Sequence, residues 1–197
     1  SGVPPVAGLG TCSIVLRVSG DSDTPNYGNV IIAHNPATYS LVNVGRYTTA
    51  NEMYLAFQNG AAEIRRFPFT FDGTMRSVIC TFDGSASPKD VAYVDGVSQT
   101  LTNPALSNTT IATGQTVCTV GGTSGFRWNG RVAEAAIYNR VITPAEALIH
   151  AAGFSCRNFP RGLIFCAPMI REVHDIVGGL TGTITGTTVS DHPRIYA

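Results

Sequence analysis

The sequence predicts an all-β protein, a β-sandwich or barrel with one short helix. Its apolar segments are short and alternate with polar residues at a period of two, which is typical of half-buried strands. The chain contains 21 glycines and 11 prolines, and Gly, Asn and Asp separate these segments, as expected for turns between antiparallel strands. One segment, residues 143–153, carries helix signals instead. A length of 197 residues fits a single domain of this class.

Seven segments account for the strands predicted before the helix, in order along the chain. They are "CSIVLRVS" (12–19), "NVIIAHN" (29–35), "EMYLAFQNGAAEIRRFPF" (52–69, two strands), "MRSVICTFDG" (75–84), "DVAYVDGVSQTL" (90–101), "TVCTVGG" (116–122) and "GRVAEAAIYNRV" (130–141). Asn59-Gly60 and Asp95-Gly96 are dipeptides that favour the hairpin turns in which both central residues have positive φ. Asp95 is therefore predicted to form a turn rather than to act in catalysis.

The helix is expected from the start and stop signals in "TPAEALIHAAG". Thr143 is placed as the N-cap, Pro144 at the first helical position and Glu146 in a capping box. Gly153 marks the C-terminal end. We expect a helix at about 143–152, on the surface of an otherwise β domain.

The segment after the helix contains another predicted strand, "LIFCAPMI", and a Gly/Thr-rich stretch typical of two short strands. The predicted organisation is an extended N-terminal arm (1–9), one sandwich (10–190) and a C-terminal tail (191–197). Residues 162–190 are expected to complete the sandwich, in their own chain or in a neighbour. Proline favours extended backbone in both ends, which suits contact arms.

Charge and composition exclude some partners. Thirteen basic and thirteen acidic residues cancel, so no overall field attracts the chain to nucleic acid or an anionic membrane. No stretch has the length and hydrophobicity of a membrane span, and no signal peptide is recognised. All basic residues except Lys89 are arginines, which suggests cations in interfaces or sheet-surface pairs.

The five cysteines are odd in number and far apart, and none forms a CxxC pair. This spacing is not typical of a zinc site or of a disulfide framework. We therefore expect all five to be reduced and the protein to be assembled in a reducing cytoplasm. They are Cys12, Cys80, Cys118, Cys156 and Cys166.

The segments "SVICTFDGSASPKDVAYVDGVSQTL" and "VGGTSGFRWNGRVAEAAIYNRVITPAEALIHAAG" resemble the second half of a laminin-G-like, concanavalin A-like jelly roll. The resemblance covers about residues 10–153. "RGLIFCAPMIREVHDIVGGLTGTITG" is similar to the stretch with which such domains begin, but here it follows the helix. This arrangement, with the closing "DHPRIYA", resembles laminin-G-like proteins encoded by bacteriophages and prophages. The fold implied by the resemblance hosts many activities.

That fold also includes glycoside hydrolases, which are the enzymatic alternative. Retaining hydrolysis needs two carboxyl groups about 5 Å apart, which asks for acids at alternate positions of a strand. Glu52, Glu134 and Glu146 each lack such a partner, and no P-loop, GxSxG or HExxH motif occurs. The sequence predicts a non-enzymatic protein with no catalytic residues.

Two kinds of binding site remain open. "SGDSDTPN" supplies Asp21, Asp23 and Asn26, oxygen ligands that suit calcium, although such residues also form ordinary turns. "GFRWNG" supplies Arg127, Trp128 and Asn129 for a glycan, with core packing of the single tryptophan as the alternative. The same two interpretations apply to four tyrosines: Tyr27, Tyr39, Tyr47 and Tyr54.

The leading functional hypothesis is a structural virion protein, a capsid decoration (cementing) protein of a bacteriophage head, or of a tail. Its partners would be capsid or other virion proteins, joined through sheet edges and arms, with a homo-oligomer expected. The alternative is a carbohydrate-binding module that attaches a virion or a cell to surface glycans.

Overall fold

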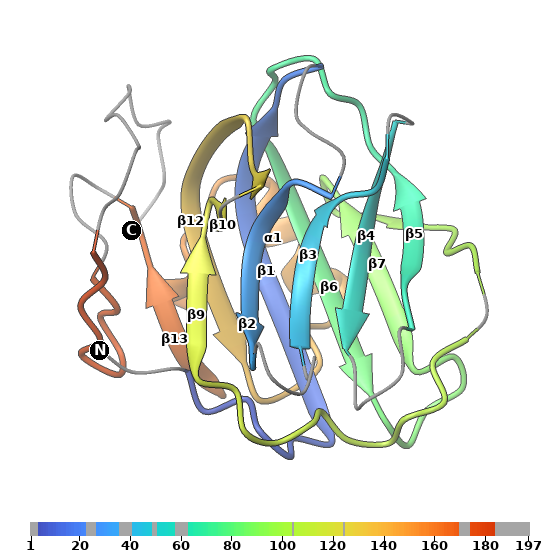
Figure 1. The fold of residues 1–197 in the computed structure, drawn as a ribbon, viewed down its shortest axis with the longest axis vertical. Coiled ribbons are helices and arrows are strands. Elements are labelled where there is room, and N and C mark those ends of the chain that lie inside the picture. The colour runs from blue at the N-terminus through green and yellow to red at the C-terminus, as the bar shows by residue number, and fades with distance from the viewer. Residues whose placement is uncertain are drawn as a thin grey trace.

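The computed structural model describes residues 4–183, apart from residues 23–26, 36–40, 49–50, 58–62, 104, 124 and 170–173. Two antiparallel sheets pack face to face and form a β-sandwich, with one short helix on its surface (Figure 1). The predicted all-β jelly-roll architecture is confirmed.

Sheet A has six strands in the order β13-β12-β1-β6-β7-β8. Its longest strands, β1 and β12, pair along almost their whole length and carry the register of the sheet. The strands are β1 (Thr11–Gly20), β6 (Arg76–Asp83), β7 (Asp90–Val94), β8 (Val97–Gln99), β12 (Gly130–Tyr138) and β13 (Leu163–Ala167).

Sheet B has five strands in the order β5-β4-β3-β2-β9, and a two-stranded ribbon, β10-β11, follows β9. The strands are β2 (Asn29–His34), β3 (Leu41–Arg46), β4 (Glu52–Phe57), β5 (Arg65–Pro68), β9 (Val117–Val120), β10 (Gly122–Thr123) and β11 (Phe126–Arg127). Strand β3 was not expected. Its polar Asn43 and its Gly45 interrupt the apolar pattern, because both lie on the face of sheet B that points away from the core.

The main core fills the space between the two sheets. Alternate residues of each strand point inward, as in "Ile14, Leu16" of β1 and "Val42, Val44" of β3, and are almost completely buried. An ion pair also crosses the sandwich at one end, where Arg65 of β5 lies 2.7 Å from Asp90 of β7. Both are buried, and this pair agrees with the expectation that arginines form interior or interface pairs.

Helix α1 (Pro144–Ala151) and the short 3-10 helix η1 (Cys156–Asn158) cover the outer face of sheet A (Figure 1). Ala147 of α1 and Cys156 of η1 pack on Val15, Ile79 and Ala136, which form a second, smaller core. Sheet A therefore buries apolar residues on both faces, although its outer face also carries Arg17 and Glu134.

The sequence signals of α1 are confirmed. The Thr143 side chain accepts a hydrogen bond from the Glu146 backbone N–H, and the Glu146 carboxylate accepts from the Thr143 N–H, which completes the capping box. Pro144 occupies the first turn. Gly153 has φ +102°, a conformation that favours glycine after a helix end.

The turn predicted at Asp95-Gly96 is also confirmed, since both residues have positive φ between β7 and β8. The Asp95 carboxylate accepts hydrogen bonds from the Ser77 N–H and from Arg76, so it also fastens the turn to β6. The other hairpin expected at Asn59-Gly60 lies outside the described residues.

Strand β13 pairs with β12 of its own chain and extends the edge of sheet A. Asp175 and Ile176 then cover the free edge of β13. The Cys166 N–H donates to the Asp175 carboxylate, and the Ile176 N–H donates to the Cys166 carbonyl. Strand β13 thus extends sheet A of its own chain, whereas part of the expected completing segment, residues 162–190, lies outside the described residues.

The N-terminal arm is described from residue 4 and does not extend freely over residues 4–9. Val6 is completely buried in the main core, and the Gly8 N–H donates to the Ile111 carbonyl. The tail at 191–197 lies outside the described residues.

The expectation that all five cysteines are reduced is wrong for two of them, because Cys156 and Cys166 form a disulfide. The fold packs η1 on the outer face of sheet A beside β13, which brings Cys156 to Cys166. The two cysteines are ten residues apart in the sequence, and this spacing does not indicate that they meet. Cys12, Cys80 and Cys118 are free, the first two in the main core.

No helix among the described residues has the length and hydrophobicity needed to cross a membrane.

The capping box predicts an acid-dependent contribution to stability. Hydrogen bonds from Arg140, and then from Thr143, lower the pKa of Glu146 from 4.5 to about 2. A lowered carboxyl pKa stabilises the folded state above the unfolded pKa, and the effect is lost as the pH falls through the folded pKa. We expect Glu146→Gln to cost about 1–2 kcal/mol at pH 7. Urea unfolding should show this difference shrinking between pH 4.5 and 2; a difference independent of pH would contradict the assignment.

Candidate functional site

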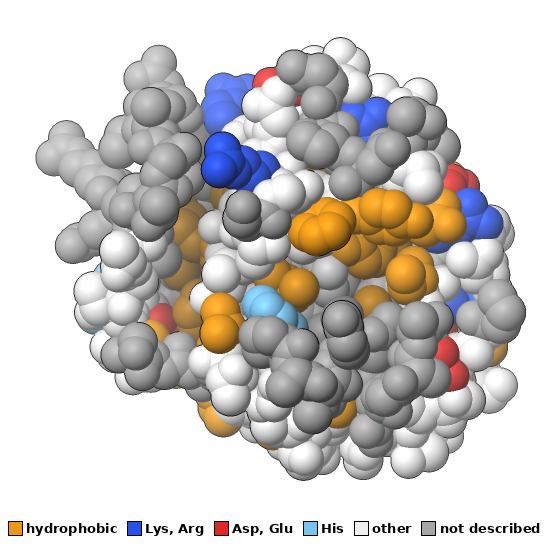
Figure 2. All heavy atoms as spheres, in the orientation of Figure 1, with side chains coloured by type: hydrophobic (Ala, Val, Ile, Leu, Met, Phe, Trp, Pro, Cys, Tyr) orange, Lys and Arg blue, Asp and Glu red, His pale blue; other side chains and the backbone are white. Residues whose placement is uncertain are grey.

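The outer face of sheet B is the candidate site. Unlike the outer face of sheet A, it is not covered by α1 or η1, which pack on the opposite side of the molecule (Figure 1). One row of residues crosses it from β4 to β9, as the strand register shows. Figure 2 shows a row of hydrophobic side chains on this face with a hollow beside it. The four residues that pair across the strands from β4 to β9 are Ala56, Asn43, Ile32 and Thr119.

A polar network joins three strands next to this row. The Tyr54 hydroxyl of β4 donates to Asn29 Oδ1 of β2 at 2.6 Å, and Asn43 Nδ2 of β3 donates to both at 2.6 and 3.0 Å. Gly45 allows this geometry, since a Cβ there would lie 3.1 Å from the Tyr54 ring and 2.5 Å from the Gly28 carbonyl. Burial raises the pKa of Tyr54, so its hydroxyl stays protonated and available as a donor.

Three tyrosines gather at one end of the same face. The rings of Tyr27, Tyr47 and Tyr54 meet edge to face, with centroids 5.5–6.5 Å apart. Arg66 of β5 lies over the Tyr47 ring at 4.7 Å and pairs with Glu52 at 3.2 Å. The structure thus brings together three of the four tyrosines named from the sequence.

Tyr27 has φ +59°, which is uncommon for a residue other than glycine. Tyr27 and Tyr47 are only partly buried, so each keeps some of its ring surface open on this face. The fourth tyrosine, Tyr39, lies outside the described residues.

Three buried polar atoms of this face have no hydrogen-bond partner in the protein: His34 Nδ1, Asn43 Oδ1 and Thr119 Oγ1. They belong to β2, β3 and β9, and alternate with inward-pointing core residues. Burial lowers the pKa of His34, so its ring is neutral at ordinary pH and offers one donor and one acceptor. A buried polar atom without a partner costs about 1–3 kcal/mol, so such groups usually serve a water or a ligand.

The strand geometry spaces these atoms over a short region. Asn43 and Thr119 stand on strands separated by β2, so they lie about 10 Å apart, and His34 is one row further along β2. Ile32 lies between Asn43 and Thr119 in this row, and Ala56 lies on the other side of Asn43, so the floor beside the polar atoms is apolar. This combination of apolar floor, tyrosine rings and dispersed polar atoms is suited to a polyhydroxylated ligand with flat apolar faces.

The glycan residues proposed from "GFRWNG" lie elsewhere. Trp128 is 7% exposed, its indole N–H donates to the Ser19 carbonyl at 2.8 Å, and its ring packs on Phe71. These contacts agree with the packing alternative. Arg127 and Asn129 are exposed on either side of it.

The calcium loop is described only in part. Asp21 is exposed, and its backbone N–H donates to the Asn129 carbonyl, whereas Asp23 and Asn26 lie outside the described residues. Within the described part of the chain, one group of His, Cys, Asp and Glu side chains is close enough to share a metal ion. It consists of Glu134, Cys156 and Cys166, on the outer face of sheet A.

Sequence reasoning did not find His34, Asn43 or Thr119. They come from three strands that are distant in the chain, and each is an ordinary polar residue in its own segment. The order β3-β2-β9 in sheet B would have been needed to place them on one face.

Comparisons with known proteins support the fold. No protein-family model and no curated protein matches the sequence. Among solved structures, a putative carbohydrate binding protein from Bacteroides ovatus matches 98% of this chain, with a TM-score of 0.68 and 14% identity. This chain spans 57% of that protein's length.

Two further structures are similar. The heptameric SAP-like pentraxin from Limulus polyphemus has a TM-score of 0.61 and 15% identity over 90% of this chain and 84% of the pentraxin. The NanB sialidase from Streptococcus pneumoniae has a TM-score of 0.55 and 15% identity over 73% of this chain, which is 24% of the sialidase. The chain has the concanavalin A-like fold, and identities this low show the fold alone.

The polar network predicts a stability cost for a small change. Tyr54→Phe removes the hydroxyl that donates to Asn29 Oδ1 and accepts from Asn43 Nδ2, so the buried network loses both of these hydrogen bonds, while Asn43 still donates to Asn29. We expect a loss of about 1–2 kcal/mol in the free energy of unfolding, measured by urea denaturation. Tyr93→Phe, on the opposite sheet, is the matched control and should cost less; equal costs would show that the network does not stabilise sheet B.

Proposed function

We propose that this protein is a carbohydrate-binding module whose ligand lies across the outer face of sheet B. The observation that carries the proposal is the set of buried, unpartnered polar atoms His34 Nδ1, Asn43 Oδ1 and Thr119 Oγ1 on a face where Asn43 also contacts Tyr54 of the tyrosine cluster. Sugar hydroxyls both donate and accept hydrogen bonds, so a single sugar chain satisfies all three kinds of atom. The pyranose faces stack on the partly exposed rings of Tyr27 and Tyr47.

The size of the site favours an oligosaccharide over a single sugar. A separation of about 10 Å between Asn43 and Thr119 exceeds one pyranose ring, whereas two linked rings span it. The similarity to a putative carbohydrate binding protein is consistent with this role.

The ligand is expected to be neutral. The cation of this face, Arg66, already pairs with Glu52 and donates to Asn103 Oδ1 at 2.8 Å. The unpartnered atoms named above are all uncharged, since the His34 ring is neutral at ordinary pH. An acidic sugar would meet no unpaired cation among the described strand residues of this face.

The proposed module is not an enzyme. Retaining hydrolysis needs a second carboxyl group about 5 Å from the first. Among the described strand residues of the outer face of sheet B, Glu52 is the sole carboxylate, and it is held by Arg66. Binding without catalysis is the function that this arrangement supports.

The virion location and the capsid partners stay predictions from the sequence. A glycan-binding face is compatible with them, because a particle that carries it would attach to a cell surface.

The binding site is tested by Thr119→Val, which keeps the shape of the side chain and removes the unpartnered hydroxyl. We expect the folded stability to be unchanged or higher, and the affinity for a neutral oligosaccharide to fall about five- to tenfold. Tyr47→Ala should abolish binding through loss of a stacking surface. A glycan array identifies the sugar, and isothermal titration measures the affinities.

Two control variants locate the effect. Leu148→Ala alters an exposed residue of α1 on the far side of the molecule, and Arg127→Ala alters the loop first proposed from the sequence. Both should bind as the wild type does. Loss of binding in Arg127→Ala with normal binding in Thr119→Val would move the site to that loop, and silence on a broad glycan array would reject the function itself.

A further inference from the structure

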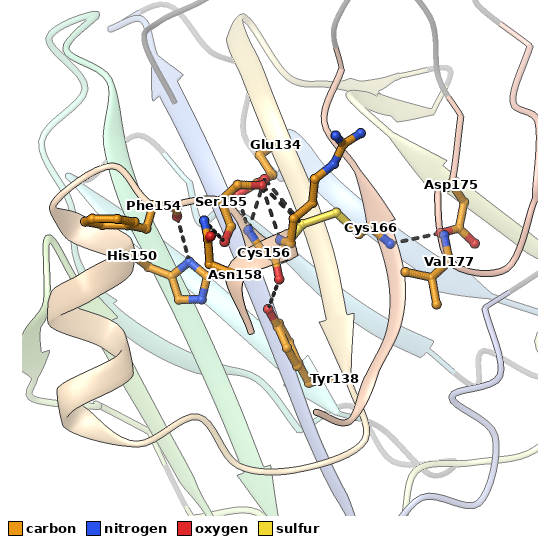
Figure 3. Close-up of a disulfide and its surroundings, with 11 residues drawn as sticks. Glu134, Tyr138, His150, Phe154, Ser155, Cys156, Asn158, Cys166, Asp175 and Val177 are labelled. Carbon is orange, nitrogen blue, oxygen red and sulfur yellow. Dashed lines mark hydrogen bonds between the residues drawn. A yellow bond between two sulfur atoms is a disulfide. The ribbon is translucent and has the colours of Figure 1, made fainter. Parts of the chain in front are cut away.

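Two cysteines and a carboxylate meet on the outer face of sheet A (Figure 3). The proposed glycan site lies on the other sheet. Cys166 of β13 stands opposite Ala136 of β12, and Glu134 is two residues away on the same face of β12. Cys156 of η1 lies over both, with its sulfur 3.3 Å from Glu134 Oε1. The sulfurs and a carboxylate oxygen lie within 4.8 Å of one another, and all three residues are buried.

We propose that Glu134, Cys156 and Cys166 form a redox-dependent site for a thiophilic divalent cation such as Zn²⁺, closed as a disulfide in the oxidised protein and able to bind metal in the reduced one. The donor set fits this class of ion, because thiolates select zinc-like metals and a carboxylate completes many zinc sites. Neither calcium nor magnesium prefers sulfur ligands.

The backbone separation suits both states. The Cα atoms of Cys156 and Cys166 are 6.6 Å apart, near the long end of the range for disulfides, which centres on about 5.5–6 Å. Two thiolates that each lie about 2.3 Å from a tetrahedral zinc ion have their sulfurs roughly 3.8 Å apart. The reduced side chains reach this separation by rotating apart, without a shift of β13 or η1.

Glu134 is oriented for a ligand role by its hydrogen bonds (Figure 3). The Ser155 hydroxyl donates to Oε1 at 2.6 Å, and the Cys156 N–H donates to the same carboxylate at 3.2–3.3 Å. On the other side, the Cys166 N–H donates to Asp175 Oδ1 at 2.9 Å. Such supporting contacts fix the geometry of metal ligands.

The exchange of disulfide for metal leaves the charge of the buried site unchanged. A dithiol reductant transfers two electrons and two protons to the disulfide, which yields two neutral thiols and oxidised reductant. Zn²⁺ then displaces the two thiol protons into solvent and binds both thiolates. The Glu134 carboxylate keeps Arg17, its cross-strand neighbour on β1, as a nearby cation in every state.

The location at a sheet edge gives access to the site. Among the described strands, β13 pairs with β12 alone, and its other edge is covered by the segment around Asp175 and Ile176. Edge elements with few pairing partners open locally at a lower free energy than central strands. Reductant and metal therefore enter without unfolding of the main core.

The experiment compares the oxidised and reduced forms of the full chain. Protein reduced with dithiothreitol is desalted without oxygen, loaded with Co²⁺ as the probe, and measured for bound metal and for thiolate-to-cobalt absorption in the near ultraviolet. Circular dichroism reports the fold of each sample. We expect about one Co²⁺ per reduced chain, displaced by Zn²⁺, and at least tenfold less in the oxidised chain.

Variants assign the ligands. Cys156→Ser/Cys166→Ser should lose the absorption, and Glu134→Gln should weaken Co²⁺ binding about tenfold while the thiolate band persists. Cys118→Ser is the matched control, because Cys118 is a free cysteine outside the cluster, and it should bind as the wild type does.

Three results overturn the proposal: no metal on the reduced chain, equal metal on the oxidised chain, or equal metal on the double cysteine variant. Unfolding of the wild type on reduction also overturns it, since the site requires the folded chain. If a variant itself does not fold, the comparison of the oxidised and reduced wild type decides.

Discussion

Every sheet in a sandwich has two faces, and the way each outer face is covered determines what this protein can do. The inner faces of sheets A and B are used alike, since both bury alternate apolar residues in the main core. Sheet A also buries an apolar cluster on its outer face, which α1 and η1 cover. Sheet B instead places Asn29, Asn43 and Tyr54 outside, and these side chains satisfy one another only in part. The outer face of sheet B therefore carries polar side chains with unused hydrogen-bonding capacity and is not covered by α1 or η1.

The sequence predicted the parts of the fold that depend on local chemistry. The capping box of Thr143 and Glu146 and the turn at Asp95 need only residues that are near in the chain. Strand β3 was missed, because Asn43 and Gly45 make its outer face polar and break the expected alternation. Asn43 and Gly45 belong to the proposed binding face. The alternation that predicts strands is therefore lost in the part of the chain to which we assign the function.

Contacts between distant segments account for the remaining differences. Trp128 drew attention as the single tryptophan, but its burial follows from Phe71 and Ser19, on segments far away in the chain. The disulfide was missed for the same reason. The proximity of Cys156 and Cys166 depends on η1 folding back over β13 after α1, and ten residues of spacing match no common motif.

Glu134 is a buried carboxylate on the covered outer face of sheet A, and its hydrogen bonds explain what it does there. A buried carboxylate costs several kcal/mol of desolvation, and an apolar side chain of similar size would avoid that cost. Here the carboxylate receives the Ser155 hydroxyl and the Cys156 N–H, which are the groups that begin η1. The interaction therefore holds η1 on sheet A and aims Cys156 at Cys166. An apolar residue at position 134 would pack against the same segment. It would make no hydrogen bond that fixes the position of η1 or the orientation of Cys156. This argues that Glu134 serves the position of the sulfur atoms, whether these are joined to each other or to a metal ion.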